Sequence, residues 1–231
     1  MGKVTILEET TKDPITKMGR SCGLCWGSKT SDPTLNYKRG KKVMLSGHGR
    51  VEEFAHVEMV LEGYSARVIR EWYTHIVGAS RLQASTRYID YTKNGGFKYV
   101  TPPSIARCPQ ALEKYQNLMK EINDTCKELE DVWGIPREDS AMLLPLGMET
   151  IIVDIRNFRS LVEMSHQRMC SRAYWEYRRL FNDICNALSE YSPEWKAIVD
   201  LMFHPKCEVF GYCPEEKGCG RMPKKGEIID R

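Results

Sequence analysis

Hydrophobic and polar residues follow two different rhythms along the chain, and each predicts one kind of element. In Ala55–Leu61 apolar residues occupy every second position, which is typical of a strand with one buried face. In Gln110–Trp133 they recur every three or four positions, which predicts a long amphipathic helix that ends before Gly134. The chain therefore combines strands with long helices.

Shorter segments extend this pattern. Residues 4–7 predict a short strand, and residues 65–75 predict a helix. Residues 29–42 are rich in Ser, Thr, Asp, Lys and Gly and predict a loop. The stretches 88–91 and 97–100 flank Asn94-Gly95-Gly96, which indicates a hairpin.

The C-terminal half is expected to be mostly helical. A β-branched run at residues 150–155 predicts one strand, and Asn157 is a suitable N-cap for a helix that reaches about Leu188. Pro193 fits the first turn of another helix that extends to Phe203. Few strands and long helices, without regular alternation, predict an α+β fold in which an antiparallel sheet packs against long helices.

Composition narrows the class of protein. With 231 residues and a net charge of +3, the chain is long enough for one full domain, and its charges nearly balance. Binding of nucleic acid is not expected, because it needs a one-sided basic field. No apolar run approaches the ~20 residues of a membrane span. The odd number of scattered cysteines and the N-terminus without an apolar core predict a cytoplasmic protein with reduced thiols.

A polar segment after the helix at 65–75 is the first candidate for chemistry. The helical pattern stops at Gly78-Ala79-Ser80, and a loop then presents Gln83, Ser85, Thr86 and Arg87 before a strand predicted from Tyr88. A hydroxyl pair beside a guanidinium suits an oxyanion such as a phosphate. A solvated loop closed by an arginine salt bridge is the alternative on residue types alone.

The helix predicted from Asn157 carries the second candidate. Arg168, Arg172 and Glu176 are spaced i, i+4 and i+8, which places them on one helical face. An exposed ion-pair ladder, Arg172 with Glu176, explains the same spacing. Apolar residues beside the two arginines indicate a face that is not fully solvated.

Three segments, read together, resemble the flavin-dependent (alternative) thymidylate synthases. In that family a helix ending in Arg-His-Arg leads to Ser-x-Arg-Tyr; here the residues are Thr74-His75-Ile76 and Ser85-Thr86-Arg87-Tyr88. The segment 47–53 resembles the family's Gly-His-x-Ser-Val-x-Glu. A third pattern needs no gap and reads Leu144-Pro145, Thr150, Asn157-Phe158-Arg159, Arg168 and Ala173-Tyr174-Trp175-Glu176.

The resemblance implies a reductive methylation of dUMP to dTMP in a homotetramer whose active sites are built from several subunits. Methylenetetrahydrofolate would supply the carbon, and FAD reduced by NADPH would supply the hydride. It implies a single catalytic domain over residues 1–203 and a Cys-rich extension over 204–231. By position, Arg168 would face the uracil and stabilise its negative charge. The implied nucleotide-binding residues are Gln83, Ser85, Thr86 and Arg87, and the implied flavin-binding residues are Arg50, Glu53, His75, Asn157, Arg159 and Arg172.

The chain departs from the family pattern at several positions. Thr74 and Ile76 replace the two arginines that flank the histidine, and Ala141 stands where a nucleotide-binding arginine is usual. Arg50 and Arg172 are arginines that the family lacks at those positions. Two alternatives stay open: a flavin- and folate-dependent hydroxymethylase that makes 5-hydroxymethyl-dUMP, or a homologue that binds nucleotide without catalysis.

The C-terminal cysteines form a separate group. His204, Cys207, Cys213 and Cys219 offer ligands suited to zinc or an iron–sulfur cluster. Each gap between cysteines is longer than in a tight ligand knuckle, which favours unliganded thiols, so no metal is expected.

Overall fold

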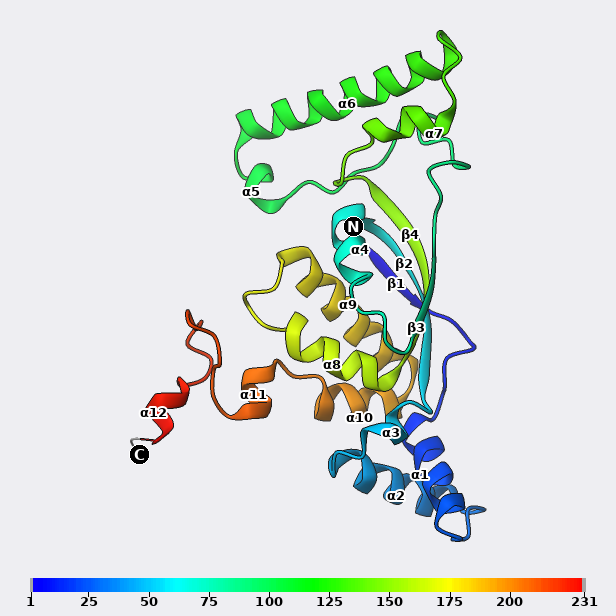
Figure 1. Ribbon diagram of the computed structural model, residues 1–231, viewed down its shortest axis with the longest axis vertical. Helices are drawn as coiled ribbons and strands as arrows, with labels where there is room; N and C mark the ends of the chain where they lie inside the picture. Colours follow the sequence, from blue (N-terminus) through cyan, green and yellow to red (C-terminus); the bar gives the residue numbers. More distant parts are fainter. Residues whose placement is uncertain (1, 230–231) are drawn as a thin grey trace. The chain divides into compact units, whose positions relative to one another are not determined.

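The computed structural model describes residues 2–229 and contains one four-stranded sheet. Its strands are β1 (Lys3–Ile6), β2 (His56–Ser65), β3 (Ala79–Gln83) and β4 (Glu149–Asn157), in the order β1-β2-β4-β3 (Figure 1). The sheet is antiparallel, and long helices accompany it, so the predicted α+β fold is confirmed.

The helices vary from single turns to a 23-residue rod. In chain order they are α1 (Pro14–Cys25), α2 (Pro33–Leu45), α3 (Gly49–Glu52), α4 (Ala66–Trp72), α5 (Pro103–Ala106), α6 (Pro109–Asp131), α7 (Arg137–Ser140), the 3-10 turn η1 (Ala141–Leu143), α8 (Phe158–Arg168), α9 (Trp175–Tyr191), α10 (Pro193–Met202), α11 (Lys206–Phe210) and α12 (Lys225–Ile229).

The chain divides into two compact units, and each of the four strands contributes residues to both. The first unit comprises the N-terminal residues to Lys3, Leu61–Glu71 and Leu82–Ile152. The second comprises Val4–Val60, Trp72–Arg81 and the chain from Val153 onward. A catalytic domain over residues 1–203 with an extension from 204 stays a prediction.

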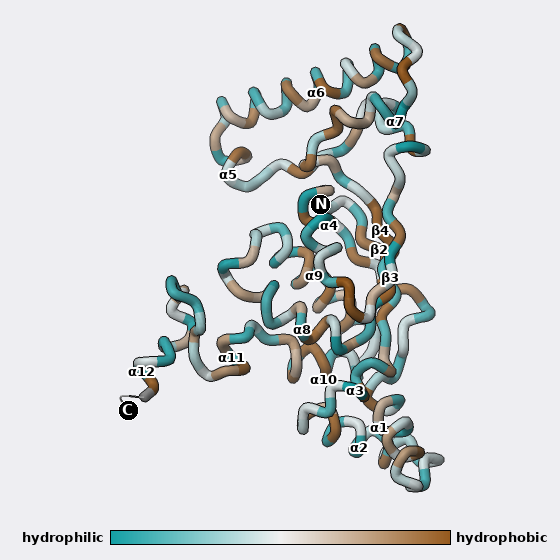
Figure 2. The backbone as a smooth tube through the Cα atoms, in the orientation of Figure 1, coloured by the Kyte–Doolittle hydropathy of each residue, from teal (hydrophilic) through white to brown (hydrophobic). Residues whose placement is uncertain are grey.

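The first unit is organised around α6. Polar and apolar residues alternate along this helix (Figure 2), as its sequence pattern predicted. Met119 on α6 packs with Phe97 and Met148 in a small core that Tyr99 and Tyr115 extend. Tyr99 meets both Phe97 and Tyr115 edge to face.

The predicted hairpin around Asn94 is wrong. Within the described residues no strand lies between β3 and β4, and the segment makes only an isolated bridge between Tyr99 and Met148. The aromatic residues that suggested strands pack under α6 instead, so tertiary contacts override their strand preference. The preceding loop prediction also needs correction, because Ala79–Gln83 forms strand β3 and Tyr88 lies in a turn.

The loop predicted for residues 29–42 is wrong as well, because α2 occupies most of it. Asp32 caps the helix by accepting hydrogen bonds from the Thr34 and Leu35 amides, and Pro33 occupies the first turn. Gly40 faces Gly19 of α1, where the two backbones approach closely. These glycines allow close helix packing rather than marking a loop.

Replacing Gly40 by alanine is expected to lower the free energy of unfolding by about 1–3 kcal/mol. The added Cβ would overlap the Ile15 carbonyl group of α1, and backbone cannot move aside as a flexible side chain can. Urea denaturation measures the change, and Gly226→Ala is a matched control because its Cβ would meet open space. Equal stability of both variants would contradict the packing described here.

The single helix predicted from Asn157 to Leu188 is wrong, although its N-cap is correct. The Asn157 side chain accepts a hydrogen bond from the Ser160 amide, and α8 then ends at Arg168. A new helix, α9, begins at Trp175. One straight helix over this range would be about 47 Å long. The break instead lets α9 return to α8, so that Tyr177 meets Arg168.

Candidate functional site

His75 and Arg168 form the centre of the site in the second unit. His75 follows α4, and Arg168 is the last residue of α8. The Arg168 Nε donates a hydrogen bond to the His75 Nε2 over 3.1 Å. The guanidinium of Arg168 lies 4.3 Å from the centre of the Tyr177 ring, a cation–π geometry. The motif residues separated by 93 positions in sequence therefore meet directly.

The backbone of His75 is held by two further arginines. Arg81 and Arg156 each donate from Nη1 to the His75 carbonyl oxygen, over 3.0 Å and 2.9 Å. Arg81 also lies over the Tyr73 ring at 4.3 Å. Arg81 lies on β3 and Arg156 on β4, so two elements other than α4 place cationic donors beside His75.

Arg156 belongs to a fully buried charge network. Its guanidinium makes two 3.0 Å hydrogen bonds to Asp154, and both side chains have no solvent exposure. The Trp72 indole donates to Asp154 over 2.8 Å, and Arg156 lies 4.5 Å from the Trp72 ring centre. A buried pair with this many hydrogen bonds has a fixed geometry. Arg156, fixed in this way, holds the His75 carbonyl oxygen through its hydrogen bond.

The electrostatic surroundings keep His75 neutral. Burial, followed by the nearby charges of Arg168 and Arg156, lowers its pKa from 6.5 to about 4. Since a guanidinium can only donate, Nε2 accepts and the ring proton sits on Nδ1. In this tautomer the neutral imidazole accepts a hydrogen bond from Arg168 and so orients it. Because the ring carries no positive charge, it does not compete with Arg168 for an anionic group.

Protonation of His75 predicts a pH effect on stability. Its folded pKa lies below its unfolded value, so the stability it contributes is present above pH 6.5 and is lost as the pH falls toward about 4. In His75→Gln, an amide oxygen accepts from Arg168 but does not titrate. Urea denaturation between pH 7 and 4 is expected to show a smaller loss of stability in the variant than in the parent. Parallel curves would contradict a depressed His75 pKa.

Two of the predicted flavin residues, Glu53 directly after α3 and Arg159 on α8, meet at the surface of the second unit. Arg159 bonds Glu53 over 2.8 Å and Glu163 over 3.3 Å, and these side chains are about half exposed. Glu52 was not singled out from the sequence; it is buried beside this cluster, and burial raises its pKa to about 7. Asn157 caps the same helix, and Arg50 is exposed on α3.

Arg172 does not lie on the helical face predicted for it. It sits in the α8–α9 connection, 3.6 Å from Glu215 and 3.4 Å from the Lys217 carbonyl oxygen. The predicted Arg172–Glu176 ladder is therefore wrong, because the helix is interrupted between the two residues. Glu176 is buried in the first turn of α9.

The predicted nucleotide residues lie in the first unit, on β3 and the turn after it. The Ser85 hydroxyl accepts a hydrogen bond from the Arg87 amide over 3.2 Å. Arg87 is exposed and bonds Glu138 over 2.8 Å. Gln83 reaches the Thr150 hydroxyl over 3.4 Å, and Thr86 lines a small cavity beside η1. Ser85 and Arg87 thus occupy one turn, with a guanidinium that an anion can approach.

Sequence reasoning missed three residues of the central cluster: Arg81, Arg156 and Tyr177. In the sequence, Arg156 is one polar position in a β-branched strand. The structure shows that its side chain is buried against Trp72. Tyr177 follows the helix break that was not predicted. A paired Asp154-x-Arg156 in an otherwise apolar strand was the available signal, since such charges are buried only when paired.

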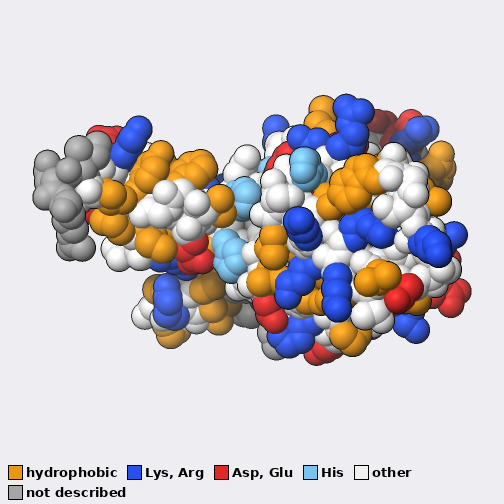
Figure 3. Space-filling model, turned by 90° about the horizontal axis from the view of Figure 1, so that it is seen from below, with side chains coloured by type: hydrophobic (Ala, Val, Ile, Leu, Met, Phe, Trp, Pro, Cys, Tyr) orange, Lys and Arg blue, Asp and Glu red, His pale blue; other side chains and the backbone are white. Residues whose placement is uncertain are grey.

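The surface carries mixed charge. On the face shown in Figure 3, Lys and Arg side chains are interspersed with hydrophobic and acidic ones. That distribution lacks the continuous basic field of a nucleic-acid interface. Among the residues that the structure describes, none of the helices has the length and apolar character that crossing a membrane requires.

Comparisons with known proteins agree on one family. The family described as thymidylate synthase complementing protein matches residues 6–194. The flavin-dependent thymidylate synthase of Nitratidesulfovibrio vulgaris is 30% identical over 190 residues, which cover 78% of this chain and 74% of that protein. The Geobacter sulfurreducens protein of the same name is 28% identical over 223 residues, covering 92% and 91%.

A solved structure shares the fold. The flavin-dependent thymidylate synthase of Helicobacter pylori, crystallised with FAD and dUMP, aligns with a TM-score of 0.66 at 18% identity. The alignment covers 84% of this chain and 98% of that one. At this identity the match concerns architecture alone.

Proposed function

The chain belongs to the family of thymidylate synthase complementing proteins, the flavin-dependent thymidylate synthases, and we propose that it converts dUMP to dTMP with FAD. The observation that carries the proposal is the contact between Arg168 and His75, which joins two of the family's motifs in one polar cluster. Bound FAD, reduced by NADPH, supplies a hydride in this chemistry, and methylenetetrahydrofolate supplies the carbon.

The residues on α3 and α8 fit an anionic dinucleotide cofactor. Arg159 and Arg50 are both exposed and offer planar guanidinium groups, which suit phosphate oxygens. Glu53 offers a carboxylate acceptor for ribose hydroxyl or adenine amino groups. Asn157 keeps the N-terminus of α8 capped, and His75 presents a neutral ring. Arg172 is also proposed to bind the cofactor, and to do so it would have to break its ion pair with Glu215.

Arg168 is the residue proposed to act on the uracil. Its Nε is engaged by His75, and the Tyr177 ring covers one face of the guanidinium. The side chain is therefore held in place before substrate arrives. A preorganised cation stabilises negative charge on the pyrimidine oxygens without the cost of reorienting at the moment of reaction.

Ser85, Thr86, Arg87 and Gln83 are proposed to bind the nucleotide. The Ser85 hydroxyl and the Arg87 guanidinium suit the dianionic phosphate of dUMP. Glu138 now neutralises Arg87, but the pair is more than half exposed and so weakly held. A phosphate can therefore displace the carboxylate at little cost, while Gln83 and Thr86 lie on the same segment.

The protein is proposed to work as a cytoplasmic homotetramer. β4 buries polar Asp154 and Arg156 on one face, whereas Ile151, Val153 and Ile155 on the other face are each more than a third exposed. A β-branched row left open to solvent is typical of a subunit interface. The scattered, unpaired cysteines support a reducing compartment.

Hydroxymethylation of dUMP is the second candidate function. It is favoured by Ile76, which is 66% exposed where the family has a guanidinium beside the histidine. An apolar side chain there removes a positive charge beside His75. The same residues would bind cofactor and nucleotide in both reactions.

Ligand binding tests the proposal before any product is measured. Purified protein is expected to bind FAD with a shifted flavin absorption spectrum, and dUMP is expected to change that spectrum further. Arg87→Ala should weaken the dUMP response by about tenfold or more, since a charged hydrogen bond contributes ~1.5–3 kcal/mol. Arg107→Ala, also in the first unit, is the control. Absence of FAD binding would contradict the proposal.

A further inference from the structure

The chain after Phe203 has almost no hydrophobic core of its own. It forms the five-residue helices α11 and α12, and among its described side chains only Pro205 and Cys207 are buried. Its polar contacts with α8 and the α8–α9 connection include the Arg172–Glu215 ion pair at 3.6 Å and hydrogen bonds of 3.4–3.5 Å to backbone carbonyl oxygens. Such contacts contribute little to stability, so the folded form of this segment lacks an evident source of stability.

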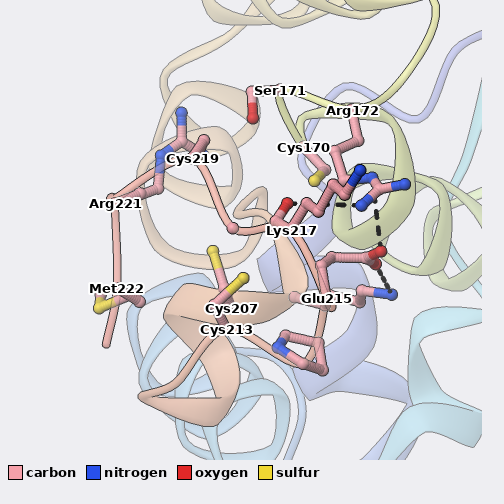
Figure 4. A pocket seen from close by; sticks show the side chains of 13 residues that line it. Cys170, Ser171, Arg172, Cys207, Cys213, Glu215, Lys217, Cys219, Arg221 and Met222 are labelled. Carbon is pink, nitrogen blue, oxygen red and sulfur yellow. Dashed lines mark hydrogen bonds and ion pairs between the residues drawn. The ribbon is translucent and has the colours of Figure 1, made fainter. Parts of the chain in front are cut away.

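Four cysteines from separate parts of the second unit line one small cavity against this segment (Figure 4). Cys170 comes from the α8–α9 connection and Cys207 from α11, while Cys213 and Cys219 lie in the loop after α11. The cavity has room for little more than one water-sized sphere. Soft sulfur donors around a space of this size suit a single thiophilic ion.

The donor set differs from the one that the sequence offered. His204 does not line the cavity, and its Nδ1 lies 3.3 Å from Glu208. Cys170 takes its place, although it lies 37 residues from Cys207 and so belongs to no local motif. The long sequence gaps between the cysteines argued against a local ligand knuckle. That argument does not apply to this site, because tertiary structure brings the four cysteines together.

Charges around the cavity favour thiolates. Cations at its rim outnumber the single carboxylate of Glu215; they are Arg172, Lys206, Lys217 and Arg221. A divalent ion with four thiolates carries two net negative charges, which such a rim stabilises.

We propose that Cys170, Cys207, Cys213 and Cys219 bind one zinc ion, which fastens the C-terminal segment to the α8–α9 connection. The four thiols release their protons to solvent as the metal–sulfur bonds form. In their present conformations the described residues contain no group of three His, Cys, Asp or Glu side chains arranged to hold a metal. Binding therefore requires the thiol side chains to change conformation, and a cysteine side chain has other staggered rotamers available about its Cα–Cβ bond.

Metal content tests the proposal. Protein expressed with Zn²⁺ in the medium and purified without chelator is expected to hold one zinc per chain, and Co²⁺ exchanged into it should show the absorption bands of tetrahedral thiolate coordination. Cys170→Ser and Cys207→Ser should each reduce zinc content at least several-fold. Cys108→Ser, an exposed thiol in the first unit, and His204→Ala should keep it.

Several results would overturn the site. They are a parent protein that takes up neither Zn²⁺ nor Co²⁺, a disulfide between any two of the four cysteines in the freshly purified chain, or full zinc content in the Cys170→Ser variant. If the serine variants fail to fold, the zinc content of the parent protein alone decides the test. Removal of zinc by a chelator should also speed proteolysis after Phe203 by about tenfold or more, and an unchanged rate would contradict the fastening role.

Discussion

Replacing Arg168 by alanine is expected to lower turnover by about 10²–10³-fold while FAD still binds. The guanidinium contacts the His75 Nε2 at 3.1 Å and the Tyr177 ring at 4.3 Å, so its orientation is fixed before substrate binds. Its loss removes a preorganised charge for the activated pyrimidine, whereas the proposed cofactor residues on α3 and the start of α8 are untouched.

The Arg168 prediction can be separated from a general loss of structure. Arg179→Ala removes a guanidinium from α9 that pairs with Asp183 at 3.8 Å, and it should keep full turnover. His75→Gln retains an acceptor for Arg168 and should lose less activity than His75→Ala. Steady-state kinetics and FAD titration measure both quantities. Full activity in Arg168→Ala would refute the role assigned to this residue.

Replacing Asp154 by alanine is expected to lower the free energy of unfolding by about 3–5 kcal/mol. The substitution leaves Arg156 charged, with no solvent exposure, and removes the acceptor of the Trp72 indole. Activity should fall too, because Arg156 positions the His75 carbonyl. Urea denaturation and turnover assays measure the two effects.

Two further variants test whether the buried charge is the cause. Asp154→Leu combined with Arg156→Met removes both charges and should recover much of the lost stability, since an apolar pair needs no counter-charge. Asp200→Ala removes the partner of Lys196 in an exposed pair and should change stability by less than ~0.5 kcal/mol. If the double variant is no more stable than Asp154→Ala, an unpaired buried charge is not the cause of the lost stability.

Local signals in the sequence predicted much of the fold. The amphipathic period of α6, the Asn157 cap and Pro193 at the start of α10 are decided by neighbours within a few residues, and each is confirmed. The missed features depend on distant contacts. Gly40 of α2 looks like a loop residue until α1 lies against it, and the helix break after Arg168 reflects the return of α9.

For the candidate site, too, local features could be predicted from the sequence and long-range contacts could not. The family pattern identified His75 and Arg168, but no local rule places a bond between residues 93 positions apart. The orientation of β4 was also beyond local reasoning, since Asp154 and Arg156 face inward beside Ile152, whereas the other β-branched residues, Ile151, Val153 and Ile155, face outward. That reversal depends on Trp72, which satisfies Asp154 from another element.

The mass of the nucleotide product tests the central claim most directly. Purified protein is incubated with FAD, NADPH, dUMP and methylenetetrahydrofolate, with Arg168→Ala in parallel, and the nucleotides are identified by mass spectrometry. The proposed function predicts dTMP from the parent and at least a hundredfold less from the variant. Formation of 5-hydroxymethyl-dUMP instead would establish the second candidate, and unchanged dUMP in a protein that binds FAD would contradict both.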